Sequence, residues 1–279
     1  MPMLIVPIGV EHKTIRTAYV TYAIIAFNTA VLVYCTALPQ AQAEAFIAAW
    51  EAPGSRFDPL LAITSGFLHA GWTHLIGNMV VFWAFARVLE EKLGHVRMAF
   101  AYLILLFFSK LALQRLTLVS YSGSLGASGA VMGMLGLFWF TFSKTRAKIF
   151  YWFLFPNVGF VWFPLLAACL LASDLVHLYL EHELHVSTGI GSLAHLGGFA
   201  AGLVLGGLWR IAAVTRVPEE DMATRLWNWL RDPFGRKARA RLEAQPDRAM
   251  DRIKNPRIQR ARAALLAQRA RKSREANSA

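Results

Sequence analysis

Apolar residues are gathered into six long stretches along the chain, and shorter polar segments separate them. A helix needs roughly 20 mostly apolar residues to cross a hydrocarbon layer of about 30 Å, and most of the stretches have about that length. Because backbone groups in lipid must be satisfied within the helix, the pattern predicts an all-α, polytopic membrane protein, a six-transmembrane-helix bundle. The predicted spans are 18–38, 72–90, 98–118, a fourth ending near 142, 159–178 and 193–214.

Composition agrees with this interpretation, since 56% of the 279 residues are hydrophobic and the mean hydropathy is +0.41. The net charge of +12 would also suit a nucleic-acid binder. Most of the basic excess lies in the last quarter of the chain, however, and no nucleic acid is expected as a partner. The two cysteines, Cys35 and Cys169, both fall in apolar stretches, so we expect no disulfide framework.

Six crossings place both ends of the chain on one side of the membrane. The basic residues of the loops fall mainly on that side, which the positive-inside rule assigns to the cytoplasm. We expect a short cytoplasmic N-terminus (1–17), a membrane core (18–213) and a basic cytoplasmic tail (214–279) that could lie on anionic lipid of a plasma or inner membrane. The long first loop (39–70) is predicted to be structured at the membrane surface, with Trp50 as an anchor.

Two of the spans open with polar side chains that could react with each other. Ser128 lies at the start of the fourth span, in GSLGASGAVMGMLG, and His195 lies near the start of the sixth, in AHLGGFAAGLVLGG. Each residue alone is more simply explained by close packing or a structural hydrogen bond. Together they suit a nucleophile and its base, because a serine becomes reactive when a base takes its proton. We expect a catalytic dyad, with Gly126 and Gly129 allowing close substrate approach and exposing N–H groups.

His74 and Asn78 are four residues apart, so they share one face of the second span. Both carry donors that could stabilise the negative charge developing on a substrate carbonyl, and the alternative is a polar clamp between helices. His69 precedes the span and is expected to brace the loop. No metal or other cofactor is expected, since the sequence contains no HExxH motif and the histidines at 69 and 74 do not share a helical face.

Asp174 and His177 are further polar side chains inside an apolar stretch, three residues apart in the fifth span. With Lys110 they permit a different function, ion-coupled transport through a proton relay. A structural hydrogen bond or a polar cavity explains the pair more simply. Neither residue is an obvious third member of a catalytic triad, so a dyad is favoured.

Three motifs, in this order, resemble those of the rhomboid family of intramembrane serine proteases: HAGWTHLIGN (69–78), GASG (126–129) and AHLGGFAAG (194–202). The segment EEKLG (90–94) adds to the resemblance, which covers roughly residues 18–213. It implies a rhomboid-like six-helix bundle. It also implies a serine endopeptidase that hydrolyses peptide bonds in or near transmembrane segments of single-pass membrane proteins, close to the outer membrane face.

The resemblance implies a role for each matched residue. Ser128 would be the nucleophile and His195 the general base. The oxyanion site would consist of His74, Asn78 and the backbone N–H of Ser128. The residues with structural roles near the site would be His69, Gly126, Gly129, Gly198, Gly202 and Glu90.

Of these structural residues, Gly198 and Gly202 would let the sixth span pack tightly against the fourth, and Glu90 would hold the inner helix ends together. Two positions depart from the family pattern. PLLAITSG stands where many members have a Trp-Arg pair, and Met132 stands where an aromatic residue often stacks on the histidine. The alternative function is a non-catalytic rhomboid-like protein that binds membrane-protein clients. Such relatives usually lack the serine or the histidine, and this chain keeps both.

Overall fold

The computed structural model describes residues 4–11, 14, 16–54, 56–117, 123–152, 156–183 and 191–211. All of them belong to one compact unit, Met1–Arg225. The predicted basic tail lies outside the described residues, as do the last positions of the sixth predicted span.

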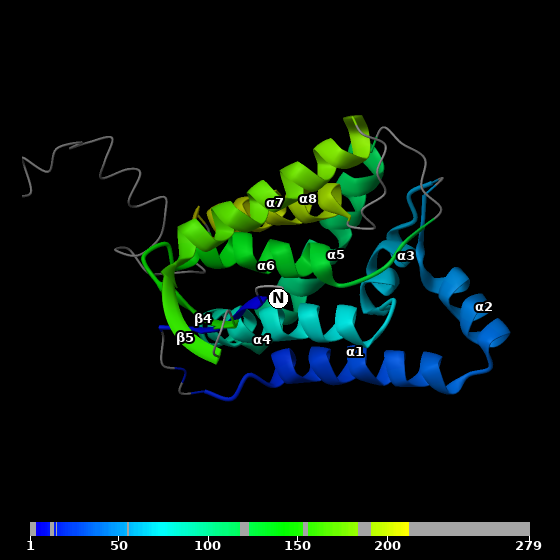
Figure 1. Ribbon diagram of the computed structural model, residues 1–279, viewed down its shortest axis with the longest axis horizontal. Helices are drawn as coiled ribbons and strands as arrows, with labels where there is room; N and C mark the ends of the chain where they lie inside the picture. Colours follow the sequence, from blue (N-terminus) through cyan, green and yellow to red (C-terminus); the bar gives the residue numbers. More distant parts are fainter. Residues whose placement is uncertain are drawn as a thin grey trace, which may run out of the picture. The chain divides into compact units, whose positions relative to one another are not determined.

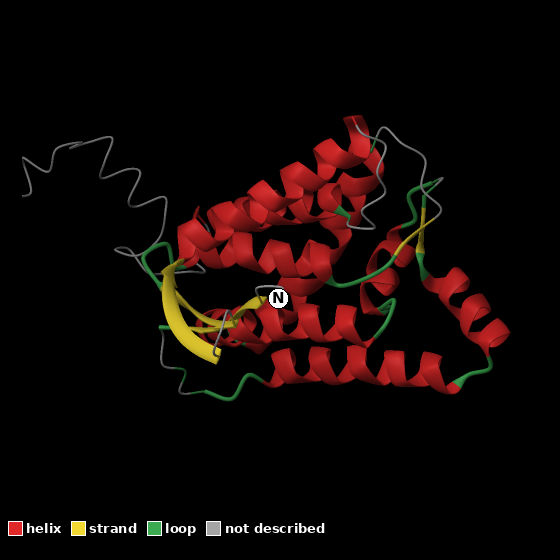
Figure 2. Cartoon of the chain, viewed as in Figure 1, coloured by secondary structure: helices red, strands yellow, loops and turns green. Residues whose placement is uncertain are grey.

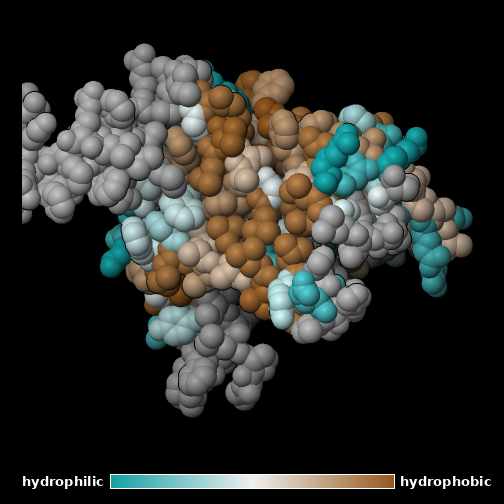
Figure 3. All heavy atoms as spheres, turned by 90° about the horizontal axis from the view of Figure 1, so that it is seen from above, coloured by the Kyte–Doolittle hydropathy of each residue, from teal (hydrophilic) through white to brown (hydrophobic). Residues whose placement is uncertain are grey.

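Six helices form the bundle, and the polytopic helical fold predicted from the apolar stretches is confirmed (Figures 1 and 2). Five of the described helices are long and apolar enough to cross a membrane. Apolar side chains cover much of the face seen in Figure 3, as expected for a surface that contacts lipid. The bundle helices are α1 (Tyr19–Ala37), α4 (Trp72–Leu93), α5 (His95–Leu116), α6 (Ser128–Thr141), α7 (Phe163–Glu183) and α8 (Ser192–Ile211).

Helix α6 differs from the other five in its length and its burial. It has 14 residues, so at 1.5 Å per residue it is about 21 Å long, shorter than a hydrocarbon layer of about 30 Å. Eleven of its residues are buried. A central helix this short begins about 10 Å inside the layer if its other end reaches the opposite surface. In that arrangement its first residue, Ser128, lies below the membrane surface.

Helices α6 and α8 pack backbone against backbone along a row of glycines. A Cβ atom on Gly198 would collide with the carbonyl oxygen of Gly129, and one on Gly202 would collide with that of Gly133. A Cβ atom on Gly136 would likewise collide with the carbonyl oxygen of Phe199. Small residues drive close helix association in lipid because they let backbones approach. This contact fixes the spacing and the register of the two helices.

The long first loop is structured, as the sequence predicts. It contains α2 (Gln40–Trp50), β2 (Ala52–Pro53), α3 (Pro59–Thr64) and the 3-10 helix η1 (Ser65–Phe67). Helix α3 replaces the Trp-Arg pair, and its start is capped because the Asp58 carboxylate accepts hydrogen bonds from the N–H groups of Leu60 and Leu61. Strand β2 pairs with β3 (Gly123–Ser124), which leads toward α6.

A three-stranded antiparallel sheet was not predicted. Its order is β1-β4-β5, from β1 (Leu4–Val10), β4 (Arg146–Trp152) and β5 (Pro156–Trp162). Because β5 ends at Trp162, the fifth span begins at Phe163 instead of Gly159. Aromatic and β-branched residues favour strands, and the pairing joins segments almost 140 residues apart, which local patterns do not reveal. The sheet lies at one end of the bundle and α2 at the other (Figure 1).

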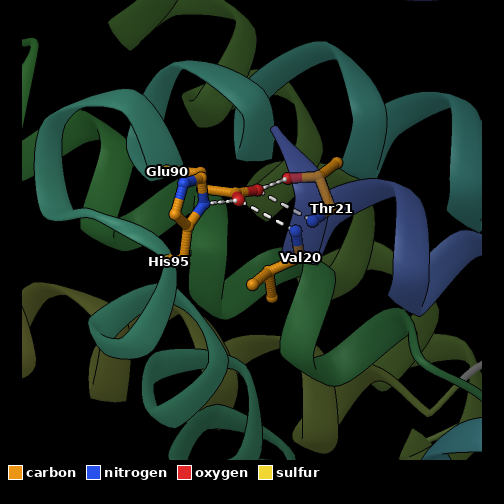
Figure 4. A network of polar contacts seen from close by, with 4 residues as sticks. All are labelled: Val20, Thr21, Glu90 and His95. Atoms are coloured by element: carbon orange, nitrogen blue, oxygen red, sulfur yellow. Dashed lines mark hydrogen bonds and ion pairs between the residues drawn. The ribbon is translucent and has the colours of Figure 1, made fainter. Parts of the chain in front are cut away.

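Glu90 joins the start of α1 to α4 (Figure 4). Its carboxylate accepts hydrogen bonds from the N–H groups of Val20 and Thr21, both at 2.8 Å, and from the Thr21 hydroxyl at 2.6 Å. The Nδ1 atom of His95 lies 2.6 Å from the same carboxylate. The residue before α1 supplies no side-chain cap, so an acidic side chain from a neighbouring helix satisfies these free N–H groups.

Candidate active site

Ser128 is the first residue of α6 and is half-buried. The chain reaches it through Gly126, whose φ of +109° lies in a region that other residues rarely adopt. The N–H of Gly126 donates to the carbonyl oxygen of Ser65, at 2.9 Å, which ties this turn to the first loop. A glycine at this position thus lets the chain turn sharply into α6 and present the serine.

The first turn of α6 leaves backbone donors free near Ser128. The earliest hydrogen bond of the helix runs from the N–H of Val131 to the carbonyl oxygen of Ala127, at 2.9 Å. By helix geometry, the N–H groups of the first three residues have no partner within the helix. Such groups, with the positive end of the helix dipole, favour negative charge beside the serine hydroxyl.

His195 lies in the first turn of α8, where its N–H donates to the carbonyl oxygen of Gly191, at 3.0 Å. The neighbours of the two predicted catalytic residues meet. A Cβ atom on Gly129 would lie 3.2 Å from the carbonyl oxygen of Ala194. Gly129 follows Ser128 and Ala194 precedes His195, so the α6–α8 contact brings the serine and the histidine to the same level of the bundle.

The imidazole of His195 is hydrogen-bonded on its Nδ1 side. Its Nδ1 atom lies 2.8 Å from the Oδ1 atom of Asp174 on α7. The two side chains are 16% and 8% exposed, so the pair is largely withdrawn from solvent. A carboxylate can only accept, so Nδ1 carries the proton and Nε2 is left with its lone pair. The histidine is thus in the tautomer that a general base requires.

His74 and Asn78 lie on the first turns of α4, and His74 lies near the start of α6. A Cβ atom on Gly126 would lie 2.8 Å from the Cε1 atom of His74, so the ring lies against the turn that leads to Ser128. Asn78 is buried, and its side-chain Nδ2 has no hydrogen-bond partner among the described residues. Buried donors are rarely left unpaired, and this one is free for a ligand.

His69 lies behind His74, with the two ring centroids 5.2 Å apart. It is buried, and neither ring nitrogen has a hydrogen-bond partner in the described part of the chain. Burial, and then the nearby charge of His74, lower the pKa of His69 from 6.5 to about 4. The side chain is therefore neutral at physiological pH and packs against the site without adding charge.

Lys110 faces the protein interior. It is 4% exposed, and its Nζ atom donates to the Ser124 hydroxyl at 2.7 Å. The relay expected of a transporter is not formed between Asp174 and His177. Asp174 bonds to His195, and the buried Nδ1 atom of His177 has no hydrogen-bond partner among the described residues.

The three remaining residues with predicted structural roles, Gly198, Gly202 and Glu90, lie in different parts of the bundle. Gly198 and Gly202 lie in the contact between α6 and α8. Glu90 follows Asn78 by twelve residues on α4, about 18 Å along the helix, so it does not belong to the site. The described residues contain no group of three or more His, Cys, Asp or Glu side chains placed to hold a metal.

Sequence reasoning missed the partnership of Asp174 with His195. A carboxylate inside an apolar span was a usable signal, because such residues are expensive in lipid and tend to be paired. The choice of partner depends on the rotation of α7 about its axis. That helix is apolar on most sides, so its sequence does not reveal which face meets α8.

Comparisons with known proteins identify the family of the chain. Residues 57–211 match the model of the Rhomboid domain family. The chain is 33% identical to RHOMBOID-like protein 4 of Arabidopsis thaliana over 147 residues, which are 52% of this chain and 32% of that protein. It is 36% identical to mitochondrial Rhomboid protein 1 of Saccharomyces cerevisiae over 114 residues, 38% of this chain and 31% of that protein. The match thus spans about a third of the length of each of these relatives.

Proposed function

The chain belongs to the rhomboid family and is an integral membrane protein, and from this premise we propose that it is a serine endopeptidase. Its substrates are single-pass membrane proteins, cut in or near their transmembrane segments. Ser128 is the nucleophile and His195 the general base. The observation that carries the proposal is the close approach of Gly129 to Ala194, since these residues are the chain neighbours of Ser128 and His195 on two tightly packed helices.

Acylation begins when the Nε2 atom of His195 accepts the proton of the Ser128 hydroxyl. The serine oxygen then attacks the substrate carbonyl and forms a tetrahedral intermediate with a negative oxygen. As this intermediate collapses, the imidazolium returns the proton to the leaving amine. An acyl-enzyme on Ser128 remains.

The negative oxygen of the intermediate is stabilised by donors that surround Ser128. They are the free N–H groups at the start of α6, the His74 side chain and the unpaired amide of Asn78. The Asn78 amide supports this role because it has no hydrogen-bond partner among the described residues, so the negative oxygen can accept a hydrogen bond from it. Removing one such donor typically costs about 3 to 4 kcal/mol of transition-state stabilisation.

Hydrolysis of the acyl-enzyme requires water inside the bilayer. In this proposal water reaches the half-buried Ser128 from the nearer aqueous phase, which is consistent with a helix α6 shorter than the hydrocarbon layer. The opposite end of the bundle carries the basic Arg146 and Lys148 on β4. The positive-inside rule makes that end cytoplasmic, so both termini are cytoplasmic and the site opens to the outer face.

Substrate preference follows from the need to expose a peptide bond. An intact helix keeps its carbonyls in hydrogen bonds and shields them from attack. Residues that weaken the helix near the outer end of the substrate span therefore favour cleavage. The physiological substrates are membrane proteins with such a segment.

The proposal is tested by incubating the purified protein with a model single-pass substrate in liposomes. Ser128→Ala and His195→Ala are each expected to lower kcat by at least about 10³-fold, because both groups take part in the proton transfer. Ser173→Ala on the exposed side of α7 is the matched control and should cleave like the wild type.

Two results would overturn the proposal. Undiminished cleavage by both variants would mean that the serine and histidine do not perform the chemistry. Stable binding of membrane-protein clients without any cleavage by the wild type would favour the non-catalytic rhomboid-like function instead.

A further inference from the structure

We propose that Asp174 is the third member of the site, a positioning residue that orients His195 and stabilises its protonated form. This inference rests on the proposed function, since it concerns the base of the same reaction. It replaces the dyad expected from the sequence with a Ser-His-Asp arrangement drawn from α6, α8 and α7.

The first support is the geometry of the pair. The 2.8 Å separation between Nδ1 of His195 and Oδ1 of Asp174 is that of a charge-assisted hydrogen bond. The Asp174 side chain is only 8% exposed, so water does not satisfy the carboxylate in place of the imidazole. A carboxylate buried inside a membrane-spanning helix is costly unless it has a partner, and His195 is that partner.

The second support is that, within the described part of the chain, the bond to Asp174 is the side-chain hydrogen bond that orients the ring. Met132, one turn beyond Ser128 on α6, has a thioether that packs against a ring but does not fix its rotation. The buried Nδ1 atom of His177, one turn along α7, has no hydrogen-bond partner among the described residues, and Asp174 bonds to His195 instead. Orientation of His195 therefore depends on the bond to Asp174.

The chemistry of the pair follows from which groups carry protons. Because Nδ1–H donates to Asp174, the lone pair of His195 is on Nε2, the atom that takes the Ser128 proton. The imidazolium that forms then carries a positive charge beside the carboxylate. Asp174 stays ionised throughout, and the proton passes from the serine oxygen to Nε2 and on to the leaving amine.

The test compares two variants of the full-length protein in the substrate assay. Asp174→Asn keeps the shape of the side chain and removes its charge, and Asp174→Ala removes both. Each is expected to lower kcat roughly 100-fold while KM stays within about 3-fold, because the bond acts on the proton transfer and not on substrate binding. Ser173→Ala, a neighbour on the exposed side of the same helix, should keep wild-type values.

A spectroscopic readout separates positioning from a general effect on folding. In protein labelled with ¹⁵N-histidine, the Nδ1–H proton of His195 should give a strongly downfield NMR resonance that disappears in Asp174→Asn. The melting temperature of the Asn variant, measured in the same detergent, should stay near that of the wild type.

The outcomes distinguish this inference from the proposed function. If Ser128→Ala is inactive but Asp174→Asn keeps kcat within 3-fold of the wild type, Asp174 has no role in positioning and only this inference fails. If the wild type neither cleaves substrate nor reacts with a fluorophosphonate, both proposals fail.

Discussion

The contact between α6 and α8 and the contact between α1 and α4 are built in opposite ways. Helix α6 meets α8 through glycines, with the backbone of one helix against that of the other. Helix α1 meets α4 through larger side chains and through the Glu90 hydrogen bonds at one end. At the α6–α8 contact even an added Cβ atom would collide with backbone, while the α1–α4 contact leaves a hollow along part of its length.

The hollow between α1 and α4 is an open groove of about 430 Å³. Its lining comes from both helices: Tyr22, Ile25, Thr29, Trp72, Leu75, Ile76, Met79, Val80 and Trp83. Side chains of this kind can repack around lipid when a helix shifts. The α1–α4 contact is therefore packed less closely than the α6–α8 contact.

The closer of the two contacts lies where the proposed reaction needs exact geometry. Proton transfer between Ser128 and His195 tolerates little displacement, because a misplacement of about 1 Å can cost about 10²-fold in rate. The pair lies on the contact that cannot shift without backbone collisions. Helix α1, which makes the looser contact, contributes none of the proposed catalytic residues.

The largest effect is expected where a side chain is forced between α6 and α8. In Gly202→Val the new Cβ would collide with the carbonyl oxygen of Gly133 and lie 2.8 Å from the N–H nitrogen of Leu137. Backbone atoms cannot rotate away, so we expect a loss of at least about 3 kcal/mol of unfolding free energy together with loss of cleavage. Denaturation in mixed micelles measures the first and the substrate assay the second. Wild-type stability and activity in this variant would contradict the rigid contact.

A smaller effect is expected where α1 is joined to α4. Glu90→Ala removes the acceptor for the N–H groups of Val20 and Thr21 and leaves these donors unpaired. We expect a loss of about 3 kcal/mol of unfolding free energy, by the same measurement, because several charge-assisted bonds are lost. The folded protein should still react with a fluorophosphonate at the wild-type rate. Glu44→Gln, on the exposed surface of α2, is the control, and a slowed reaction in Glu90→Ala would show that α1 does position the site.

A weaker, pH-dependent effect is expected from His69. Its pKa is lowered to about 4 in the folded protein, so between pH 6.5 and 4 the unfolded chain binds a proton that the folded chain does not. Stability is therefore lost as the pH falls through this window and is unaffected by His69 above it. In His69→Gln the melting temperature should fall less steeply from pH 6.5 to 4 than in the wild type. Parallel curves for the two proteins would show that His69 is not held neutral by burial.

The smallest effect is expected at a glycine outside the close contacts. Gly77 on α4 is exposed, and a Cβ atom there would meet no atom within 4 Å. Gly77→Ala should leave cleavage unchanged and raise the unfolding free energy by up to about 1 kcal/mol, because alanine favours the helix. It is the matched control for Gly202→Val. A large loss of stability in Gly77→Ala would mean that glycines matter in this bundle for reasons other than close approach.

Local sequence patterns predicted the bundle well because each helix has an apolar stretch of its own in the sequence. The apolar stretches locate α1, α4 and α5 within a few residues, and the short run after Ser128 gives α6. The family resemblance of the motifs around Ser128 and His195 implied the contact between α6 and α8, and the glycines that make it are small enough for close packing. These features depend on periodicity and residue size, which a sequence shows directly.

Features that depend on distant partners were missed. The strand Leu4–Val10 has no helical or amphipathic signal that points to Arg146–Trp152, so the sheet could not be predicted. Asp174 was identified as unusual, but its bond to His195 depends on how α7 is rotated. The aromatic and β-branched residues of Arg146–Trp152 favour a strand, but its partner strand is distant in the sequence.

The most direct test of the central claim is to locate a covalent adduct by mass spectrometry after treating the purified protein with a fluorophosphonate. The reagent marks a serine only when a base activates it. The account predicts one adduct, on Ser128, that is lost or at least about 10²-fold slower in His195→Ala. An adduct on another serine, or labelling of Ser128 at an equal rate without His195, would contradict it.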